Sequence, residues 1–188
     1  MPSLNKEQLK EIIDLSIFKG ISFQTFVETG TYRGDTIFAM EPMFDKLHTL
    51  EIKQEFYENC KAKYNGSKIT FHLGDSSTVL PSILHNIQGD AIFFLDGHWS
   101  SKNTGRGPKD VPLFEELDAI NTLFKGKALL IIDDYRLFGR HPQAFFKFKY
   151  HTEDWRHITK RSLISRIKAR VIYNFVHNDR FSICIREK

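Results

Sequence analysis

Two apolar runs in this chain end on carboxylates, and such positions could bind a cation. DAIFFLD ends on Asp96, and ALLIIDD ends on Asp133 and Asp134. If the two runs are neighbouring strands, these three side chains converge, and two carboxylates about 4 Å apart repel by about 4 kcal/mol at an effective dielectric of 20. A cation relieves that repulsion, and oxygen ligands suit Mg²⁺, Ca²⁺ or Mn²⁺ rather than Zn²⁺. We therefore expect Asp96, Asp133 and Asp134 to form a metal site.

A histidine lies two residues beyond the first of these aspartates. His98 stands in the loop that would cover the site. Its unperturbed pKa of about 6.5 suits a general base near neutral pH, so we predict a catalytic role for His98 beside Asp96. A single histidine is also a common structural residue, and the sequence leaves both roles open.

Acidic residues end the other apolar runs as well. Glu28, Glu51 and Asp75 close TFVE, KLHTLE and KITFHLGD. Open α/β sheets bind ligands beyond the carboxyl ends of their strands. A row of uncompensated carboxylates at one sheet edge repels itself, so packing alone does not explain the pattern. The row indicates a binding site.

The first strand-to-helix turn reads ETGTYRGDT, residues 28–36. Thr31 stands where a dinucleotide-binding turn needs its second glycine, which disfavours an NAD-dependent oxidoreductase. Glu28 would oppose a pyrophosphate but can receive an ammonium group. Glu51, 21 residues after Gly30, can accept both hydroxyls of a ribose, and Asp75 can meet an exocyclic amine.

Helical patterns separate the apolar runs. Their spacing predicts helices over residues 5–18, 33–42, 53–64, 77–87 and 112–124 and a basic helix over 154–168. ARVIYNFVHNDRFSICIRE predicts a hairpin that turns at residues 177–179. Strands that alternate with helices imply an α/β fold with a mostly parallel sheet and helices on both faces. The length suits one domain, 1–188, with a leading helix in 1–20 and the core in 21–188.

Four ordered pieces, ETGTYRG, LHTLEI, HLGDSS and FFLDGH, resemble the class I S-adenosylmethionine-dependent methyltransferases over about residues 22–186. The resemblance implies a Rossmann-like, seven-stranded sheet that an antiparallel hairpin completes, and it implies S-adenosylmethionine as cofactor. It places Glu28, Gly30 and Gly34 at the methionine part, Glu51 at the ribose, and Asp75 with Ser76 at the adenine. The other residues expected at the cofactor are Thr29, Thr31, Tyr32, Asp35, Thr36, Ile52 and Asp96.

The ends of the fourth and fifth strands carry a narrower resemblance. LDGHW and LIIDDYR look similar to the metal-dependent O-methyltransferases of the catechol and macrocin types. This implies methyl transfer to a hydroxyl with help from a divalent cation. Asp134 stands where the catechol type has asparagine, and the loop after His98 is less acidic than in the macrocin type. Lys102, near the place of the catechol-type catalytic lysine, is the alternative to His98.

The loop between these strands suggests the acceptor. Cations there suit a phosphorylated molecule, so we favour a sugar or nucleotide-sugar over a catechol or other phenol. Solubilising surface charges are an equally weighted alternative for the same cations. The residues expected to contact the substrate are Trp99, Arg106, Lys109, Tyr135 and Arg136.

Charge is unevenly distributed. Residues 135–188 hold 13 Lys/Arg against 4 Asp/Glu, which suggests an anionic partner such as a phosphate or a nucleic acid. Nucleic-acid 2′-O-methyltransferases typically carry lysine where Asp133 stands, so nucleic acid is disfavoured. Two cysteines outside any metal spacing, and no apolar leader or run of about 20 residues, predict a cytoplasmic protein without a membrane segment. The 17 phenylalanines would permit a homo-oligomer, and a non-catalytic binding module with this fold is the remaining alternative.

Overall fold

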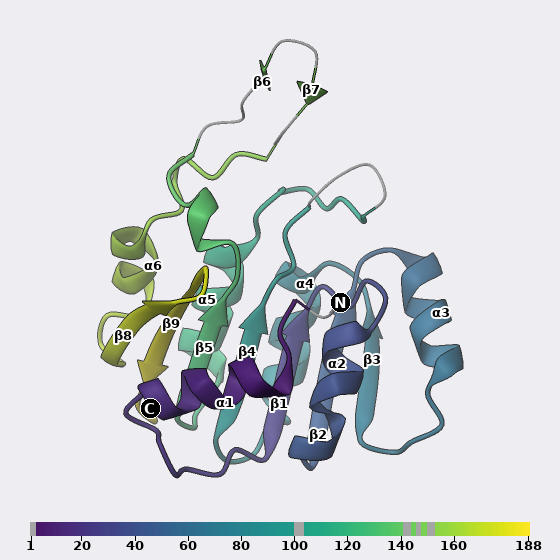
Figure 1. Cartoon of the computed structure of the whole chain (residues 1–188), viewed down its shortest axis with the longest axis horizontal. Helices are drawn as coiled ribbons and strands as arrows, with labels where there is room; N and C mark the ends of the chain where they lie inside the picture. Colours follow the sequence, from purple (N-terminus) through teal and green to yellow (C-terminus); the bar gives the residue numbers. More distant parts are fainter. Residues whose placement is uncertain (1–2, 100–103, 141–143, 146–147, 150–152) are drawn as a thin grey trace.

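The computed structural model describes residues 3–99, 104–140, 144–145, 148–149 and 153–188. Seven strands form one sheet in the order β3-β2-β1-β4-β5-β9-β8 (Figure 1). Their bounds are β1 Thr25–Thr29, β2 Lys46–Glu51, β3 Ile69–Leu73, β4 Ala91–Leu95, β5 Ala128–Ile132, β8 Val171–His177 and β9 Arg180–Ile185. Strands β1 to β5 pair in parallel, and β9 runs antiparallel to both β5 and β8. The predicted α/β fold with an antiparallel closing hairpin is confirmed.

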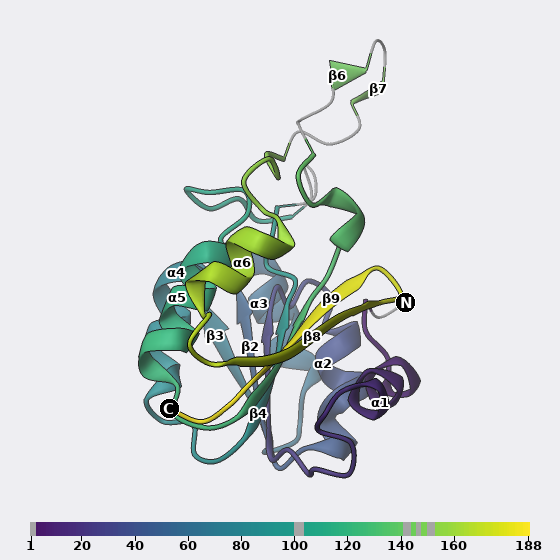
Figure 2. The same ribbon diagram turned by 90° about the vertical axis from the view of Figure 1, so that its left-hand side faces the viewer.

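Helices cover both faces of the sheet. Figure 2 shows α4, α5 and α6 on one side and α1 and α2 on the other. The helices are α1 Lys6–Leu15, α2 Asp35–Met40, α3 Gln54–Lys63, α4 Ser76–Leu84, α5 Leu113–Leu123 and α6 Lys160–Arg166, with short 3-10 turns η1 Glu41–Met43 and η2 Tyr135–Leu137. Within the described ranges, no helix is both long and apolar enough to cross a bilayer.

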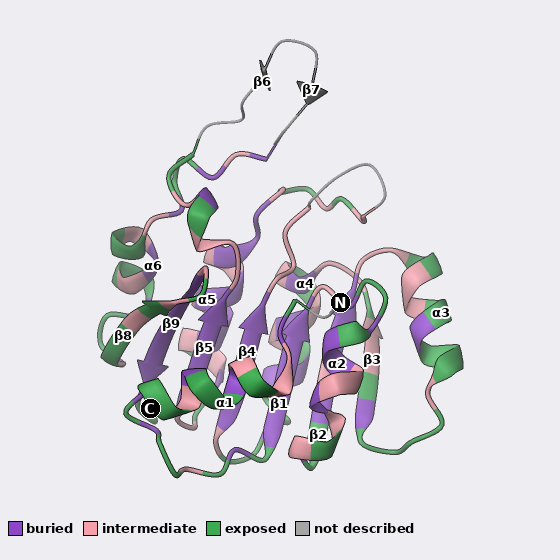
Figure 3. Ribbon diagram, in the orientation of Figure 1, coloured by how far each residue is buried: buried purple, intermediate pink, exposed green. Residues whose placement is uncertain are grey.

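The central strands are buried on both faces. All five residues of β1, β4 and β5 are buried (Figure 3), as expected for parallel strands between two helical layers. Alternation along β4 divides the core, because Phe93 packs with the α4–α5–α6 layer and Phe94 with the α1–α2 layer. The strand ends are therefore held rigidly, and they define where the acidic residues emerge.

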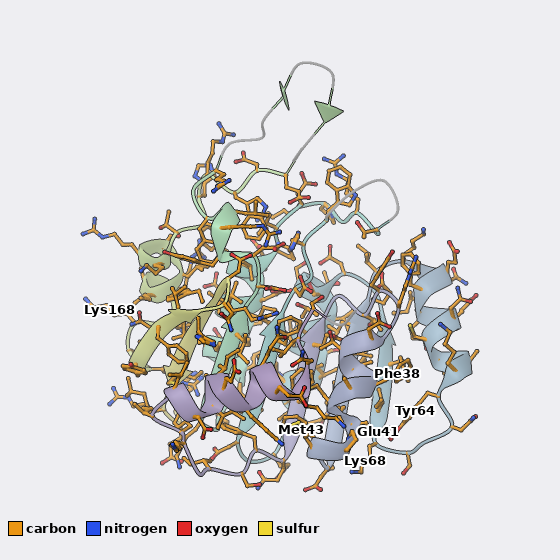
Figure 4. All side chains as sticks on the ribbon, in the orientation of Figure 1. Phe38, Glu41, Met43, Tyr64, Lys68 and Lys168 are labelled. Atoms are coloured by element: carbon orange, nitrogen blue, oxygen red, sulfur yellow. The ribbon has the colours of Figure 1, made fainter. Side chains whose placement is uncertain are left out.

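The two outer parallel strands are fixed at the end opposite those acids. The Tyr64 hydroxyl donates to Glu41 Oε1 (2.7 Å) and accepts from the Lys68 amide (2.8 Å) at the entry to β3. Phe38 stacks on Tyr64 with 6.2 Å between ring centroids. Figure 4 shows these side chains together beside β3, at its end nearest α2. This anchor steadies β2 and β3 and so their carboxyl ends.

The structure differs from the prediction in two helices and in one additional hairpin. The predicted helix over 154–168 is wrong at its start, because α6 begins at Lys160, where the Thr159 side chain accepts from the Ser162 amide (3.1 Å). The preceding Trp155 is buried instead. The predicted helix over 33–42 divides at Glu41 into α2 and η1. A short hairpin, β6 Ala144–Phe145 and β7 Phe148–Lys149, was not predicted and extends away from the sheet (Figure 1).

Candidate active site

A cavity of about 490 Å³ lies beyond the carboxyl ends of the parallel strands. Most of the predicted cofactor residues line it, and they lie at the ends of β1, β2, β3 and β4. They are Glu28, Gly30, Thr31, Tyr32, Asp35, Thr36, Glu51, Ile52, Asp75, Ser76 and Asp96. Thr29 and Gly34 lie outside the lining and shape the turn from behind. The predicted binding edge and the cavity therefore coincide.

Gly30 lets the first turn approach the end of β4. Its φ is +89°, and a Cβ atom built there would lie 2.5 Å from the carbonyl oxygen of Asp96. The Gly30 and Thr31 amides both donate to the Leu50 carbonyl (2.9 and 3.1 Å), and the Asp96 amide lies 3.3 Å from Thr29 Oγ1. Glycine is required here, and the turn locks β1, β2 and β4 together at the cavity floor.

Glu28 is a buried acid at the base of this turn. Its Oε2 accepts from the Thr49 hydroxyl (2.7 Å), and Thr49 lies 2.6 Å from the Thr31 hydroxyl. Burial raises the pKa of Glu28 well above its usual range, the Thr49 bond opposes this, and the charges of Asp96 and Glu51 add to it. An ammonium group in the cavity would find a strong electrostatic partner here.

Glu51, at the end of β2, accepts hydrogen bonds from two backbone amides. Its Oε2 accepts from Tyr32 N (2.7 Å) and its Oε1 from Lys53 N (2.8 Å). Burial raises the pKa of Glu51 overall, and these backbone hydrogen bonds oppose the increase only in part. Tyr32 has a φ of +48°, which the bond to Glu51 stabilises. Both oxygens keep a lone pair for a ligand, as a ribose diol would need.

Asp75 caps α4 and meets a glycine loop. Its Oδ1 accepts from the Ser77 amide (2.8 Å) and hydroxyl (2.6 Å). A Cβ atom on Gly107 would lie 2.3 Å from Asp75 Oδ2, and one on Gly105 would lie 2.1 Å from Ile52. The loop therefore comes close to the residues predicted to hold the nucleoside, and only glycine allows this approach.

The other end of the cavity gathers Asp96, His98 and Asp134. One ligand atom from each lies within 4.8 Å of the others. His98 Nε2 lies 2.7 Å from Asp134 Oδ2 and 3.5 Å from Asp96 Oδ1, and His98 Nδ1 lies 3.7 Å from Glu153 Oε2. The imidazole is thus enclosed by three carboxylates, and Trp155 packs edge-on against it with 5.0 Å between ring centroids.

Charge within this group is balanced by His98. Burial alone would lower the pKa of His98, but the Asp134 hydrogen bond and the charges of Asp96, Asp134 and Glu153 raise it to about 9. Burial, followed by the charge of Asp133, raises the pKa of Asp96 to about 7. Burial acts against ionisation of Asp134 too, yet its bonds to His98 and Arg136 lower its pKa overall. Among these side chains, the protonated imidazole offsets the clustered carboxylates.

Asp133 faces a different partner from the one expected. Asp133 lines the cavity, and its Oδ1 lies 3.5 Å from Arg180 Nε, whereas the ligand atoms that lie within 4.8 Å of one another come from Asp96, His98 and Asp134. Successive strand residues point to opposite sides, but Asp134 has a φ of +58°, and this left-handed turn places its side chain next to His98. Burial raises the pKa of Asp133, and Arg180 offsets part of this.

Two of the five predicted substrate residues line the cavity, Trp99 and Lys109. Arg106 lies outside it, stacked over the Trp99 ring at 4.4 Å and bonded to both oxygens of Asp110 (2.7 and 3.2 Å). Lys109 forms an ion pair with Glu115. These cations are therefore partly neutralised by neighbouring acids.

The remaining two, Tyr135 and Arg136, lie outside the cavity lining. Tyr135 contacts Phe138 with 5.2 Å between ring centroids, and Arg136 forms ion pairs with Asp134 and Asp179. Arg136 thus orients Asp134 in this structure. Lys102, the alternative base, lies outside the described residues.

Sequence reasoning missed a buried acid in the same region. Glu116 of α5 is fully buried, and neither of its carboxyl oxygens has a hydrogen-bond partner among the described residues. Burial raises its pKa to about 7, which the neighbouring hydroxyls of Ser76 and Thr29 oppose only in part. A signal existed, because Glu116 lies on the apolar face of its helix, three residues after Leu113.

Glu153 and Trp155 were also missed, since both fell in or near the predicted basic helix. The Trp155 indole donates to Glu153 Oε2 (3.0 Å), which positions this carboxylate beside His98. Ser3 and Arg180 were missed as well: Ser3 lines the cavity, and Arg180 contacts Asp133 from β9. Nothing local in the sequence marks either residue.

Solved structures share this architecture, although no family model matches the chain and no curated protein matches its sequence. The PH0226 protein of Pyrococcus horikoshii OT3 aligns with a TM-score of 0.61 and 15% identity over 97% of this chain and 91% of that one. An S-adenosylmethionine-dependent methyltransferase of Clostridium acetobutylicum ATCC 824 gives 0.60 and 10% over 98% and 93%. A putative methyltransferase of Streptococcus mutans, in complex with SAH, gives 0.57 and 10% over the whole of both chains. The chain therefore has the class I methyltransferase fold.

Proposed function

We propose that this chain is an S-adenosylmethionine-dependent O-methyltransferase that acts on a hydroxyl of a small molecule. In this proposal Asp96 and Asp134 hold a divalent cation. The cation would replace protonated His98 as the positive charge beside these carboxylates and lower the pKa of His98, so that the neutral imidazole can accept the hydroxyl proton. One observation carries it: a single cavity joins the glycine turn and acids that suit a nucleoside to the Asp96–His98–Asp134 group. The first end suits a methyl donor and the second suits an acceptor oxygen.

The cofactor end is supported by three acids with distinct environments. Glu28 would receive the ammonium of the methionine part, Glu51 the ribose hydroxyls, and Asp75 Oδ2 the adenine amine. The fold points the same way, because the Clostridium and Streptococcus proteins are named as methyltransferases and the latter was solved with SAH. Fold similarity does not by itself assign function, so the acids and the cavity that they line carry the argument.

The donor set fits a divalent cation. Two carboxylates and an imidazole present atoms within 4.8 Å of one another. Carboxylate oxygens suit Mg²⁺ and Mn²⁺, and in this proposal Asp96 and Asp134 bind the cation while His98 stays unliganded as the base. When bound, a cation here supplies positive charge that lowers the pKa of an acceptor hydroxyl and orients it.

The chain's own residues then perform the rest of the transfer. The acceptor oxygen attacks the sulfonium methyl carbon, the C–S bond breaks with its electron pair on sulfur, and the hydroxyl proton passes to His98. The Asp96–Gly97–His98 segment is fixed against β1 by the Thr29 contact, so the acceptor side is held in register with the donor side. Trp155 and Glu153 hold the imidazole from behind and restrict its orientation.

The acceptor that we favour is a sugar or a nucleotide-sugar. Trp99, Lys109 and Arg33 all line the cavity. An aromatic surface with cations nearby suits a sugar ring that carries a phosphate. Because Lys109 is paired with Glu115, a phosphate must compete with that acid, and a neutral polyol is the natural comparison in an acceptor screen.

Calorimetric titration tests both ends of the site. S-adenosylhomocysteine should bind the wild-type chain with micromolar affinity, and Mn²⁺ should then bind in a second titration. Asp134→Asn should weaken Mn²⁺ binding at least tenfold. Asp118→Asn is the control and should leave Mn²⁺ binding unchanged, because Asp118 lies on α5 and is paired with Arg166. Failure of the nucleoside to bind would refute the methyltransferase proposal, and equal Mn²⁺ affinity in both variants would refute the cation site.

Turnover identifies the acceptor and the base. Formation of S-adenosylhomocysteine is measured with nucleotide-sugars, free sugars and catechols, with and without Mn²⁺. His98→Gln should reduce kcat at least a hundredfold while the Mn²⁺ affinity changes less than threefold, because the base is then lost and the cation site kept. A parallel loss of Mn²⁺ affinity would instead make His98 a metal ligand and contradict its role as base.

A further inference from the structure

The segment ahead of α1 crosses the carboxyl ends of the sheet. Figure 1 shows the first described residues rising from α1 toward the ends of β1 and β4, and Figure 2 shows the same point beside the turn between β8 and β9. Ser3 lines the cavity, and its side chain interacts with Asp96. Leu4 is fully buried in the core on the α1–α2 side. We call residues 3–5 the strap.

The strap is attached at both of its sides. The Leu4 amide approaches Thr36 Oγ1 (3.4 Å), which ties it to the first turn of α2. On the other side, an Arg180 guanidinium nitrogen donates to the Ser3 carbonyl. Asn5 then begins α1 with a reciprocal cap to Gln8, so the strap cannot merge with the helix.

Arg180 joins the strap to the acidic end of the cavity. It is only 6% exposed, and its Nε, which has no hydrogen-bond partner among the described residues, lies 3.5 Å from Asp133 Oδ1. The same guanidinium donates to the carbonyls of Ser3 and Asn178. A buried arginine is the residue type that can serve several acceptors at once, because its five N–H groups have a fixed geometry.

We infer that the strap forms a wall of the cofactor site at the methyl-transfer end and that Arg180 is the positioning residue that holds it there. This rests on the proposed function for the identity of the bound nucleoside. Ser3 lines the cavity beside Asp96, so the strap would contact a nucleoside bound at this end. Releasing the strap therefore weakens retention of the nucleoside without removing a group that reacts.

Hydrogen exchange of the full chain tests the wall directly. In wild type, the amides of residues 4–9 should exchange more slowly once S-adenosylhomocysteine is added. Arg180→Met should speed exchange at the Leu4 amide at least tenfold without nucleoside and should raise the Kd for S-adenosylhomocysteine about five- to thirtyfold. Arg166→Met, on α6 and paired with Asp118, is the matched control and should change neither quantity.

A second variant guards against loss of folding. Arg180→Met leaves Asp133 without its partner, so Arg180→Met combined with Asp133→Asn removes both charges and keeps the broken link to Ser3. KM for S-adenosylmethionine should rise more than kcat falls in this variant. Leu4 exchange equal to wild type in both variants would overturn the inference. If wild type binds no nucleoside, the proposed function fails, while Leu4 exchange without ligand still decides whether Arg180 holds the strap.

Discussion

Replacing Glu116 by glutamine should remove a pH dependence of stability that this buried carboxyl creates. Its pKa is raised to about 7 from the ordinary 4.5 because burial penalises the charged form. The folded chain therefore holds this proton more tightly than the unfolded chain does. The stability that the proton contributes is present below about pH 4.5 and is lost as the pH rises through about 7. One pKa unit corresponds to about 1.4 kcal/mol, so the loss is about 3 kcal/mol.

The assay is urea unfolding of wild type and Glu116→Gln at pH 4.5 and pH 8. The free energy of unfolding of the variant minus that of wild type should be about 3 kcal/mol larger at pH 8 than at pH 4.5. Wild type loses this stability as the pH rises, whereas the amide of the variant has no proton to lose. Constant effects of the substitution cancel in this comparison. Glu115→Gln, one residue away and paired with Lys109, is the control. Parallel stability curves for wild type and Glu116→Gln would refute the reasoning.

Two further predictions use matched positions. Gly30→Ala should lower the unfolding free energy by about 2–5 kcal/mol, because left-handed backbone strain adds to overlap with the Asp96 carbonyl. Gly20→Ala is the control: Gly20 has a φ of +82° and open space around it, so the loss in the same thermal or urea assay should be only about 1–2 kcal/mol. Equal losses in the two variants would contradict the overlap. Arg170→Met should lower the unfolding free energy by about 2–4 kcal/mol, since Arg170 donates to four backbone carbonyls; Arg161→Met on the exposed side of α6 should change it by less than about 0.5 kcal/mol, and a comparable effect would refute the role of these bonds.

The binding edge could be read from the sequence because its signals are local. AIFFL and ALLII are continuous apolar runs of strand length, and the structure buries both completely. The residue after each run must then emerge at the sheet edge, which predicts the positions of Asp96 and Asp133. The turn around Gly30 could also be predicted from the sequence, since glycine at a strand-to-helix junction indicates close backbone approach.

Which side chains form the Asp96–His98–Asp134 group could not be predicted in the same way. Alternation along a strand does not tell which of two adjacent aspartates reaches His98. Both line the cavity, and the left-handed backbone of Asp134 places its side chain next to the imidazole. Asp133 met Arg180, a residue from β9 that no local pattern connects with it. Trp155 was assigned to the predicted basic helix, because the prediction did not use Thr159 as the N-cap at which α6 begins. Tertiary contacts between distant segments determined each of these outcomes.

The link between Ser3 and Arg180 also constrains the order in which the chain can assemble. The two residues are 177 positions apart, and β9, which carries Arg180, lies inside the sheet between β5 and β8. During synthesis the strap emerges long before its partner, which is present only after residue 180 has been made. Contacts of such long range are slow to form. Folding therefore completes the cavity wall late, and a chain stopped before β9 would expose both the edge of β5 and an open site.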